Sequence, residues 1–224
     1  DILECAPVIA AVQDSKWDAA ITSPAKIIFY LQANILNIKE RINEAHTADK
    51  LLFVHIDLAE GIGRDKSGIQ YLADLGVDGI MTTRNQLVRF AKDNGLLAVQ
   101  RFFLLDSKGF ENIDEIIANN TPDMIEIMPG VIPKAIERFA MGRVPVIAGG
   151  LVETAEEVNN AISAGAFSVS VGKRNIRKKK WPICLAFHNP IFLVLKKLLQ
   201  LRLNRIFQML VALELMAKKH QAVS

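Results

Sequence analysis

Short apolar runs rich in β-branched residues recur along the first 172 residues, at intervals of about 20–25 positions. A strand of a parallel sheet whose outer side is covered by helices is buried on both faces, so it reads as a continuous apolar run rather than an alternating one. The pattern therefore predicts eight buried strands, at 5–12, 26–31, 51–57, 77–83, 96–105, 124–130, 144–150 and 167–172.

Segments with a helical period separate the apolar runs. The segment 34–48 places four apolar residues on one stripe and turns its polar side chains away from them. These four residues are Ile35, Ile38, Ile42 and Ala45. The segments 85–93 and 154–164 show the same period, and in the second of them Thr154 precedes Glu157 by three residues, which is a capping-box pattern. The chain therefore alternates strand and helix.

Eight such alternations within the first 172 residues predict a closed barrel, the compact (β/α)8 TIM-type fold of the α/β class. The usual TIM barrel has about 250 residues, so the loops of this one have to be short. An open, doubly wound sheet is the alternative. We favour the barrel because eight strands close it, and because glycine-containing loops follow the seventh and eighth runs.

Residues 173–224 do not continue the alternation. A basic run occupies 176–181, and 191–217 reads as one long helix that is apolar nearly all round. Such a helix has to pack on the barrel, on a second subunit in a homodimer, or on a membrane surface. We therefore divide the chain into a barrel domain at 1–181 and a hydrophobic, basic C-terminal extension at 182–224, whose role the sequence leaves open.

Composition and charge narrow the class of protein. Half of the chain is hydrophobic and 23% is charged, which is ordinary for a globular domain and excludes a disordered or collagen-like chain. Residues 1–172 carry 15 Lys and Arg against 23 Asp and Glu, a net charge of −8, whereas 173–224 carry 12 against one, a net charge of +11. A basic segment on an acidic body favours a polyanionic partner such as RNA or anionic lipid, and a solvated helix face is the alternative.

The cysteine pattern and the apolar segments indicate in which cellular compartment the protein is expected. Cys5 and Cys184 are far apart and suggest neither a disulfide framework nor a zinc site, which favours a reducing, cytoplasmic setting. The sequence does not open with a basic stretch followed by an apolar run, so we expect no secretory signal. Its most apolar stretch, 182–195, is interrupted by polar residues and a proline, so we expect no membrane span.

Glycines at the ends of the last two predicted strands indicate an anion site. Gly149 and Gly150 close the seventh run, and Gly172 with Lys173 closes the eighth. Glycines let backbone N–H groups approach an anion, and loops after strands seven and eight form the usual phosphate site of TIM barrels. The sequence therefore predicts a phosphate ligand, whereas tight turns alone are the simpler alternative.

Polar residues near the ends of other strands indicate a second part of the same pocket. His55 and Asp57 alternate along the third run and are expected to point the same way. Arg101 and Glu126 lie on the fifth and sixth runs and could join them. We interpret the four as a lining that binds hydroxyl groups, although a layer of mutually satisfied buried polar residues would look the same.

The carboxylates of such a lining could also act as a general base in an isomerase or aldolase. No lysine suited to a Schiff base is evident at a strand end, since Lys173 lies in the predicted phosphate loop, and the HExxH, GxSxG and Walker motifs do not occur. We therefore expect no enzyme, no catalytic residue and no metal ligand.

Several strings taken together resemble one family, the glycerol-3-phosphate-responsive antiterminators of bacterial glycerol operons. The resemblance runs over 7–181, about four-fifths of the chain. The strings are VHIDLAEGIGRD (54–65), QRFFLLDS (100–107), PDMIEIMPGVIPK (122–134), IAGGL (147–151), NILNIKE (34–40) and GIMTTR (79–84). The family's strand-eight loop is often rich in Ser, Thr and Asn, whereas here it reads SVGKRNIRKKKW (170–181), and nothing is transferred to 182–224.

The resemblance implies a barrel without catalytic turnover that senses glycerol 3-phosphate as its effector and needs no cofactor. It further implies that the protein binds the leader mRNA of a glycerol operon and prevents premature termination. Carried over by position, the phosphate would be held by Gly149, Gly150, Gly172 and Lys173. The glycerol moiety would face His55, Asp57, Arg101 and Glu126.

The sequence itself says less about RNA. It has no RRM, KH or zinc-knuckle signature, and aromatic residues make up only 7% of the chain. One dense basic patch could neutralise RNA phosphates, unless it is simply a solvated tail. It consists of Arg174, Arg177, Lys178, Lys179 and Lys180. Two other functions stay open: an isomerase or lyase acting on a small phosphorylated polyol, and a membrane-surface protein that uses 191–217.

Overall fold

Eight parallel strands close into a barrel in the computed structural model of the chain, which describes residues 7–178 and 181. Each strand pairs in parallel with the next one along the chain, and the last pairs with the first. The strands are β1 (Val8–Val12), β2 (Ile27–Tyr30), β3 (Leu51–His55), β4 (Gly79–Thr82), β5 (Leu97–Phe103), β6 (Met124–Met128), β7 (Val146–Gly149) and β8 (Ser168–Val171). The predicted TIM-type barrel is confirmed, and the open sheet is excluded.

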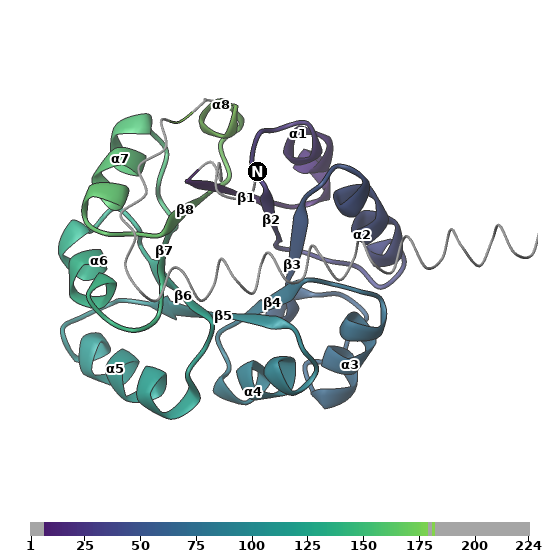
Figure 1. Ribbon diagram of the computed structural model, residues 1–224, viewed down its shortest axis with the longest axis horizontal. Coiled ribbons are helices and arrows are strands. Elements are labelled where there is room, and N and C mark those ends of the chain that lie inside the picture. Colours follow the sequence, from purple (N-terminus) through teal and green to yellow (C-terminus); the bar gives the residue numbers. More distant parts are fainter. Residues whose placement is uncertain (1–6, 179–180, 182–224) are drawn as a thin grey trace, which may run out of the picture.

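Helices surround the barrel, as Figure 1 shows in a view along its axis. They are α1 (Trp17–Ile21), α2 (Ile38–Thr47), α3 (Lys66–Asp74), α4 (Asn85–Asp93), α5 (Lys108–Asn120), α6 (Pro133–Ala140), α7 (Ala155–Ser163) and α8 (Arg174–Arg177). The predicted capping box starts α7: Thr154 Oγ1 accepts a hydrogen bond from the Glu157 backbone N–H, and the Glu157 carboxylate accepts one from that of Thr154.

Alternation along each strand divides the core into an inner and an outer part. The inner part fills the barrel with side chains that include Phe29, Phe53, Val99, Met124 and Ile147. The outer part lies between strands and helices, with one cluster on the side of β1–β5 and another on the side of β5–β8. Both faces of each strand are therefore buried, which explains the continuous apolar runs of the sequence.

The helix expected over 34–48 is shorter than predicted, because Asn34 engages in a different interaction. Its side chain accepts a hydrogen bond from the Leu36 backbone N–H at 2.9 Å and donates one to Glu60 at 2.8 Å. Asparagine competes in this way with helical hydrogen bonding, and α2 begins only at Ile38. Ile35 consequently lies outside the helix and is 40% exposed, whereas the other three residues of the predicted stripe are buried.

The short helix α8 follows β8 and packs against β1 and α1. The Trp181 side chain packs against the outer core on the β5–β8 side. The predicted extension at 182–224, with its helix at 191–217, lies outside the described residues. Within residues 7–178 and 181, no helix is long and apolar enough to cross a membrane.

Candidate functional site

A layer of polar side chains lies above the apolar filling of the barrel, toward the carboxyl ends of the strands. It includes His55 after Leu51 and Phe53 on β3, Arg101 after Val99 on β5, and Glu126 after Met124 on β6. Each follows apolar residues of the inner core at a spacing of two, so all three face the barrel interior. Ser170 joins them from β8. We call His55, Arg101, Glu126 and Ser170 the mouth cluster.

Glu126 is the centre of the mouth cluster. Its carboxylate is fully buried, and each oxygen accepts one hydrogen bond, from Arg101 Nε at 2.6 Å and from Ser170 Oγ at 2.6 Å. The Arg101 side chain is 10% exposed, so the ion pair is largely removed from water. A buried carboxylate is tolerated only with such partners. The cluster therefore holds a fixed charge pair at the carboxyl-terminal end of the barrel.

His55 differs from the other members of the mouth cluster in its hydrogen bonding. It is 3% exposed, and neither ring nitrogen has a hydrogen-bond partner among the described residues. Burial, with a contribution from the nearby Arg101 charge, lowers the pKa of His55 to about 4. The ring is therefore neutral at pH 7, with one nitrogen able to donate and the other to accept. Buried polar atoms usually have a partner, so His55 is suited to bind a polar group from a ligand.

The lowered pKa of His55 predicts a loss of stability in acid. The unfolded chain binds a proton near pH 6.5, whereas folded His55 does so only near pH 4. The stabilisation by neutral His55 is therefore complete above pH 6.5 and is lost as the pH falls toward 4. Between pH 7 and pH 5 the wild type should lose about 2 kcal/mol more unfolding free energy than His55→Gln. Urea titrations at both pH values measure this, and equal losses would contradict it.

Asp57 does not join the mouth cluster. The strand ends at His55, and Ile56–Leu58 forms a turn of 3-10 helix, so the alternation expected through Asp57 is wrong. Its carboxylate instead accepts hydrogen bonds from the Thr82 hydroxyl and from the Thr83 backbone N–H and hydroxyl, and lies 3.6 Å from Arg84 Nε. Asp57 thus fixes the loop between β4 and α4, and it is withdrawn from the predicted lining.

The seventh strand reaches the mouth cluster at Gly149. A Cβ atom at this position would collide with Glu126 Oε1 and would lie 2.8 Å from Ser170 Oγ. Only glycine leaves room for the two hydrogen bonds of Glu126. The next residue, Gly150, has a φ of +72°, in the left-handed region that favours glycine. Both glycines are thus required by the local geometry, in addition to any role in binding.

The loops after β7 and β8 are joined by an ion pair. Lys173 Nζ lies 3.4 Å from Glu153 Oε1, and both side chains are more than half exposed. Gly172 is also exposed, and a Cβ atom there would meet nothing closer than the Ala11 carbonyl oxygen at 3.7 Å. The four residues predicted to bind phosphate therefore lie at the same end of the barrel, with Gly149 at the end of β7 and the other three in the loops that follow β7 and β8.

The predicted basic patch is divided by α8. Arg174 and Lys178 are exposed, but Arg177 is 1% exposed and lies in the segment that packs against α1 and β1. Arg177 therefore does not belong to the surface that could meet RNA, because helix packing turns it inward. Lys179 and Lys180 lie outside the described residues.

Ser170 is a member of the mouth cluster that was not predicted from the sequence. The alternation of SVSV in β8 gives Ser168 and Ser170 the same face, which was the available signal, but only the register of β8 beside β7 brings Ser170 to Glu126. Within the described part of the chain, no group of His, Cys, Asp and Glu side chains could hold a metal ion.

Comparison with known proteins identifies relatives of this barrel. Residues 8–176 match the glycerol-3-phosphate responsive antiterminator family. An uncharacterized protein of Escherichia coli K12, YgcP, is 39% identical over 170 residues, which cover 73% of this chain and 87% of that protein.

Two solved structures are similar in sequence as well as in fold. The glycerol uptake operon antiterminator regulatory protein from Listeria monocytogenes is 31% identical, with a TM-score of 0.70, and the match covers 74% of this chain and 91% of that one. A glycerol uptake operon antiterminator-related protein from Thermotoga maritima is 33% identical, with a TM-score of 0.69, and the match covers 77% and 98%.

Proposed function

This chain belongs to the glycerol-3-phosphate responsive antiterminator family, and on that premise we propose that it is a cytoplasmic regulator that binds glycerol 3-phosphate at the barrel mouth. In the bound state it binds the leader mRNA of a glycerol-utilisation operon and prevents premature termination. The observation that carries the ligand part of the proposal is the mouth cluster, where a buried charge pair lies beside His55, whose two ring nitrogens have no hydrogen-bond partner in the described part of the chain. A barrel fold alone would not separate a regulator from an enzyme.

The glycerol moiety has the chemistry that the mouth cluster requires. Each hydroxyl group can donate and accept a hydrogen bond, and neutral His55 offers one site of each kind. Glu126 accepts one hydrogen bond on each oxygen and has lone pairs left for a further donor. A hydroxyl bound here would meet partners already held in place, which limits the entropy lost on binding.

The phosphate group is assigned to the loops after β7 and β8. Gly172 leaves its backbone open to close approach, since a Cβ atom there would meet nothing nearer than 3.7 Å, and Lys173 supplies a cation. Gly149 and Gly150 lie at the end of β7 and at the start of the loop that follows it, packed against Glu126 and Met128. This is the usual location of a phosphate in a TIM barrel. The same end of the barrel thus offers a polar interior for the polyol and a glycine-lined rim for the anion.

Neutralising Glu153 is expected to strengthen the binding of glycerol 3-phosphate. Glu153 pairs with Lys173 and would place a negative charge beside the phosphate. We expect Glu153→Gln to raise the affinity about 3- to 10-fold, since a partly exposed charge interaction contributes on the order of 1 kcal/mol. Calorimetry measures the affinity. Glu156→Gln removes an exposed carboxylate from the first turn of α7 and should change nothing; weaker binding by Glu153→Gln would instead mean that Glu153 contacts the ligand.

The regulatory part of the proposal is tested by RNA binding with and without effector. Fluorescence anisotropy of labelled leader RNA should show at least tenfold tighter binding at saturating glycerol 3-phosphate, because a ligand shifts a conformational equilibrium only through its differential affinity. Equal RNA affinity with and without glycerol 3-phosphate would refute the proposal.

The RNA-binding role of Arg174, on α8, and of Lys178, directly after it, can be tested in the same assay. Arg174→Ala with Lys178→Ala should weaken binding and reduce the salt dependence, because each lost phosphate contact lowers the slope of log affinity against log salt by about 0.7–0.9. Lys134→Ala, an exposed cation on α6, is the matched control.

A further inference from the structure

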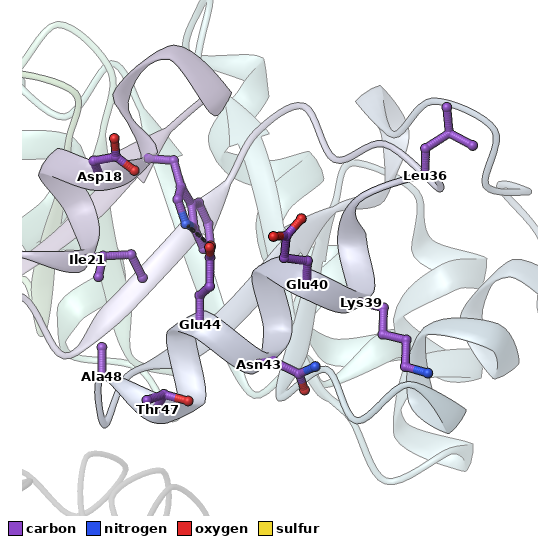
Figure 2. Close-up of a pocket in the computed structure, with 10 residues that line it drawn as sticks. Asp18, Ile21, Leu36, Lys39, Glu40, Asn43, Glu44, Thr47 and Ala48 are labelled. Atoms are coloured by element: carbon purple, nitrogen blue, oxygen red, sulfur yellow. Dashed lines mark hydrogen bonds between the residues drawn. The ribbon is translucent and has the colours of Figure 1, made fainter.

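A groove runs between α1 and α2 on the outside of the barrel (Figure 2), and no residue of the mouth cluster lines it. It is lined by Trp17, Asp18, Ile21, Leu36, Lys39, Glu40, Asn43, Glu44, Thr47 and Ala48. We call it the α1–α2 groove. Its lining combines apolar groups with three carboxylates and one lysine, so it is a net acidic surface.

Two of the three carboxylates are free to pair with a cation. Glu44 is already engaged, since it accepts a hydrogen bond from the Trp17 indole at 2.6 Å and pairs with Arg41 at 2.9 Å. Asp18 and Glu40 are exposed, and neither side chain has an ion pair or a hydrogen bond within the part of the chain that the structure describes. Figure 2 shows them on α1 and α2, on the two sides of the groove.

Apolar groups lie beside these carboxylates. Ile21 and Ala48 are partly buried in the lining, and Leu36 is 92% exposed. A solvated leucine of this kind gains from being covered by another apolar surface. A fitting occupant is therefore a segment that is both apolar and basic.

The chain itself supplies such a segment. Residues 182–224 contain six Lys and Arg and one acidic residue, Glu214, and the sequence predicts a leucine-rich helix over 191–217. The described chain ends shortly after α8, which packs against α1, and α1 forms one wall of the groove. Nine residues, 182–190, separate Trp181 from the predicted helix, and about 3.3 Å per residue gives them a reach of about 30 Å.

We propose that the segment 191–217 docks in the α1–α2 groove of its own chain, with its lysines and arginines paired to Asp18 and Glu40 and its leucines covering the apolar lining. This surface lies apart from the effector site, so the proposal does not depend on the function proposed above. It assigns the C-terminal extension to the barrel instead of to a membrane or a second subunit.

Zero-length cross-linking of the full chain tests this docking. A carbodiimide joins a carboxylate to a lysine only where the two are in contact, and mass spectrometry then identifies the linked peptides. We expect links from Lys196 or Lys197 to Asp18 or Glu40, lost in the double variant Asp18→Asn with Glu40→Gln. Glu115→Gln, an exposed carboxylate on α5, should leave the links unchanged.

An equal mixture of unlabelled and nitrogen-15-labelled protein separates the alternatives. Links within one isotopic form support docking in the same chain. Links that join the two forms would overturn the proposal in favour of a second copy, and links that avoid the groove carboxylates would overturn it altogether.

Hydrogen exchange tests the same docking without requiring a lysine to lie within cross-linking distance of a carboxylate. Charge reversal by Asp18→Lys with Glu40→Lys should speed amide exchange in 191–217 at least tenfold, and Glu115→Lys should not. Exchange in this segment of the wild type at the rate of an unstructured chain would overturn the proposal.

Discussion

Replacement of Arg101 by methionine should lower the free energy of unfolding by about 3–5 kcal/mol, the usual cost of removing one partner of a buried ion pair. Glu126 is fully buried, and after the substitution its carboxylate would keep only the hydrogen bond from Ser170. The length of the side chain is nearly conserved, so the loss would reflect the uncompensated charge rather than a cavity. Urea denaturation of wild type and variant gives the difference.

A second variant shows whether charge is the cause. Arg101→Met combined with Glu126→Gln removes both charges and leaves an amide that can still accept from Ser170. We expect the double variant to be more stable than Arg101→Met alone. A loss below about 1 kcal/mol for Arg101→Met, or a double variant that is less stable than the single one, would mean that the pair is solvated and does not organise the mouth.

Gly149→Ala should have the largest effect on ligand binding. Its Cβ would displace Glu126 from the two hydrogen bonds that hold it. Overpacking of this kind costs about 1–3 kcal/mol of stability. Because the whole mouth cluster would move, we expect the affinity for glycerol 3-phosphate to fall at least tenfold, measured by calorimetry on the folded variant.

Gly172→Ala is the matched comparison, at the end of the neighbouring strand. There the added Cβ finds only an ordinary contact, with the Ala11 carbonyl at 3.7 Å. The stability of Gly172→Ala should stay within about 0.5 kcal/mol of wild type. Any loss of affinity for glycerol 3-phosphate in this variant would therefore mean that the phosphate binds close to this loop. A stable Gly149→Ala protein with unchanged binding would show that the mouth cluster is not the ligand site.

The barrel could be predicted from the sequence because burial on both faces leaves a clear signal. Each strand appeared as a continuous apolar run, and eight of them close a barrel. The start of α2 was misplaced for a local reason, since the Asn34 side chain binds Glu60 and the Leu36 backbone and so delays the helix. The spacing of apolar residues along the chain contains no information about such a side-chain contact.

The polar site was predictable only where a strand continued as expected. Arg101 and Glu126 were placed on neighbouring strands, and the structure joins them at 2.6 Å. Asp57 was misassigned because a 3-10 turn begins directly after His55 and changes the direction of the side chain. Arg177 lies in a basic run, and only the packing of α8 against α1 shows that it is buried. These features depend on register and packing, which no single segment encodes.

Calorimetric titration of the full chain with glycerol 3-phosphate tests the proposed effector most directly. Glycerol and inorganic phosphate are titrated in parallel, and each should engage only one of the two parts of the site. Glycerol 3-phosphate should bind at least tenfold more tightly than either, and His55→Ala should remove most of that advantage while leaving the affinity for inorganic phosphate unchanged. Binding of glycerol 3-phosphate no tighter than that of inorganic phosphate would contradict the assignment of this barrel as a sensor of that metabolite.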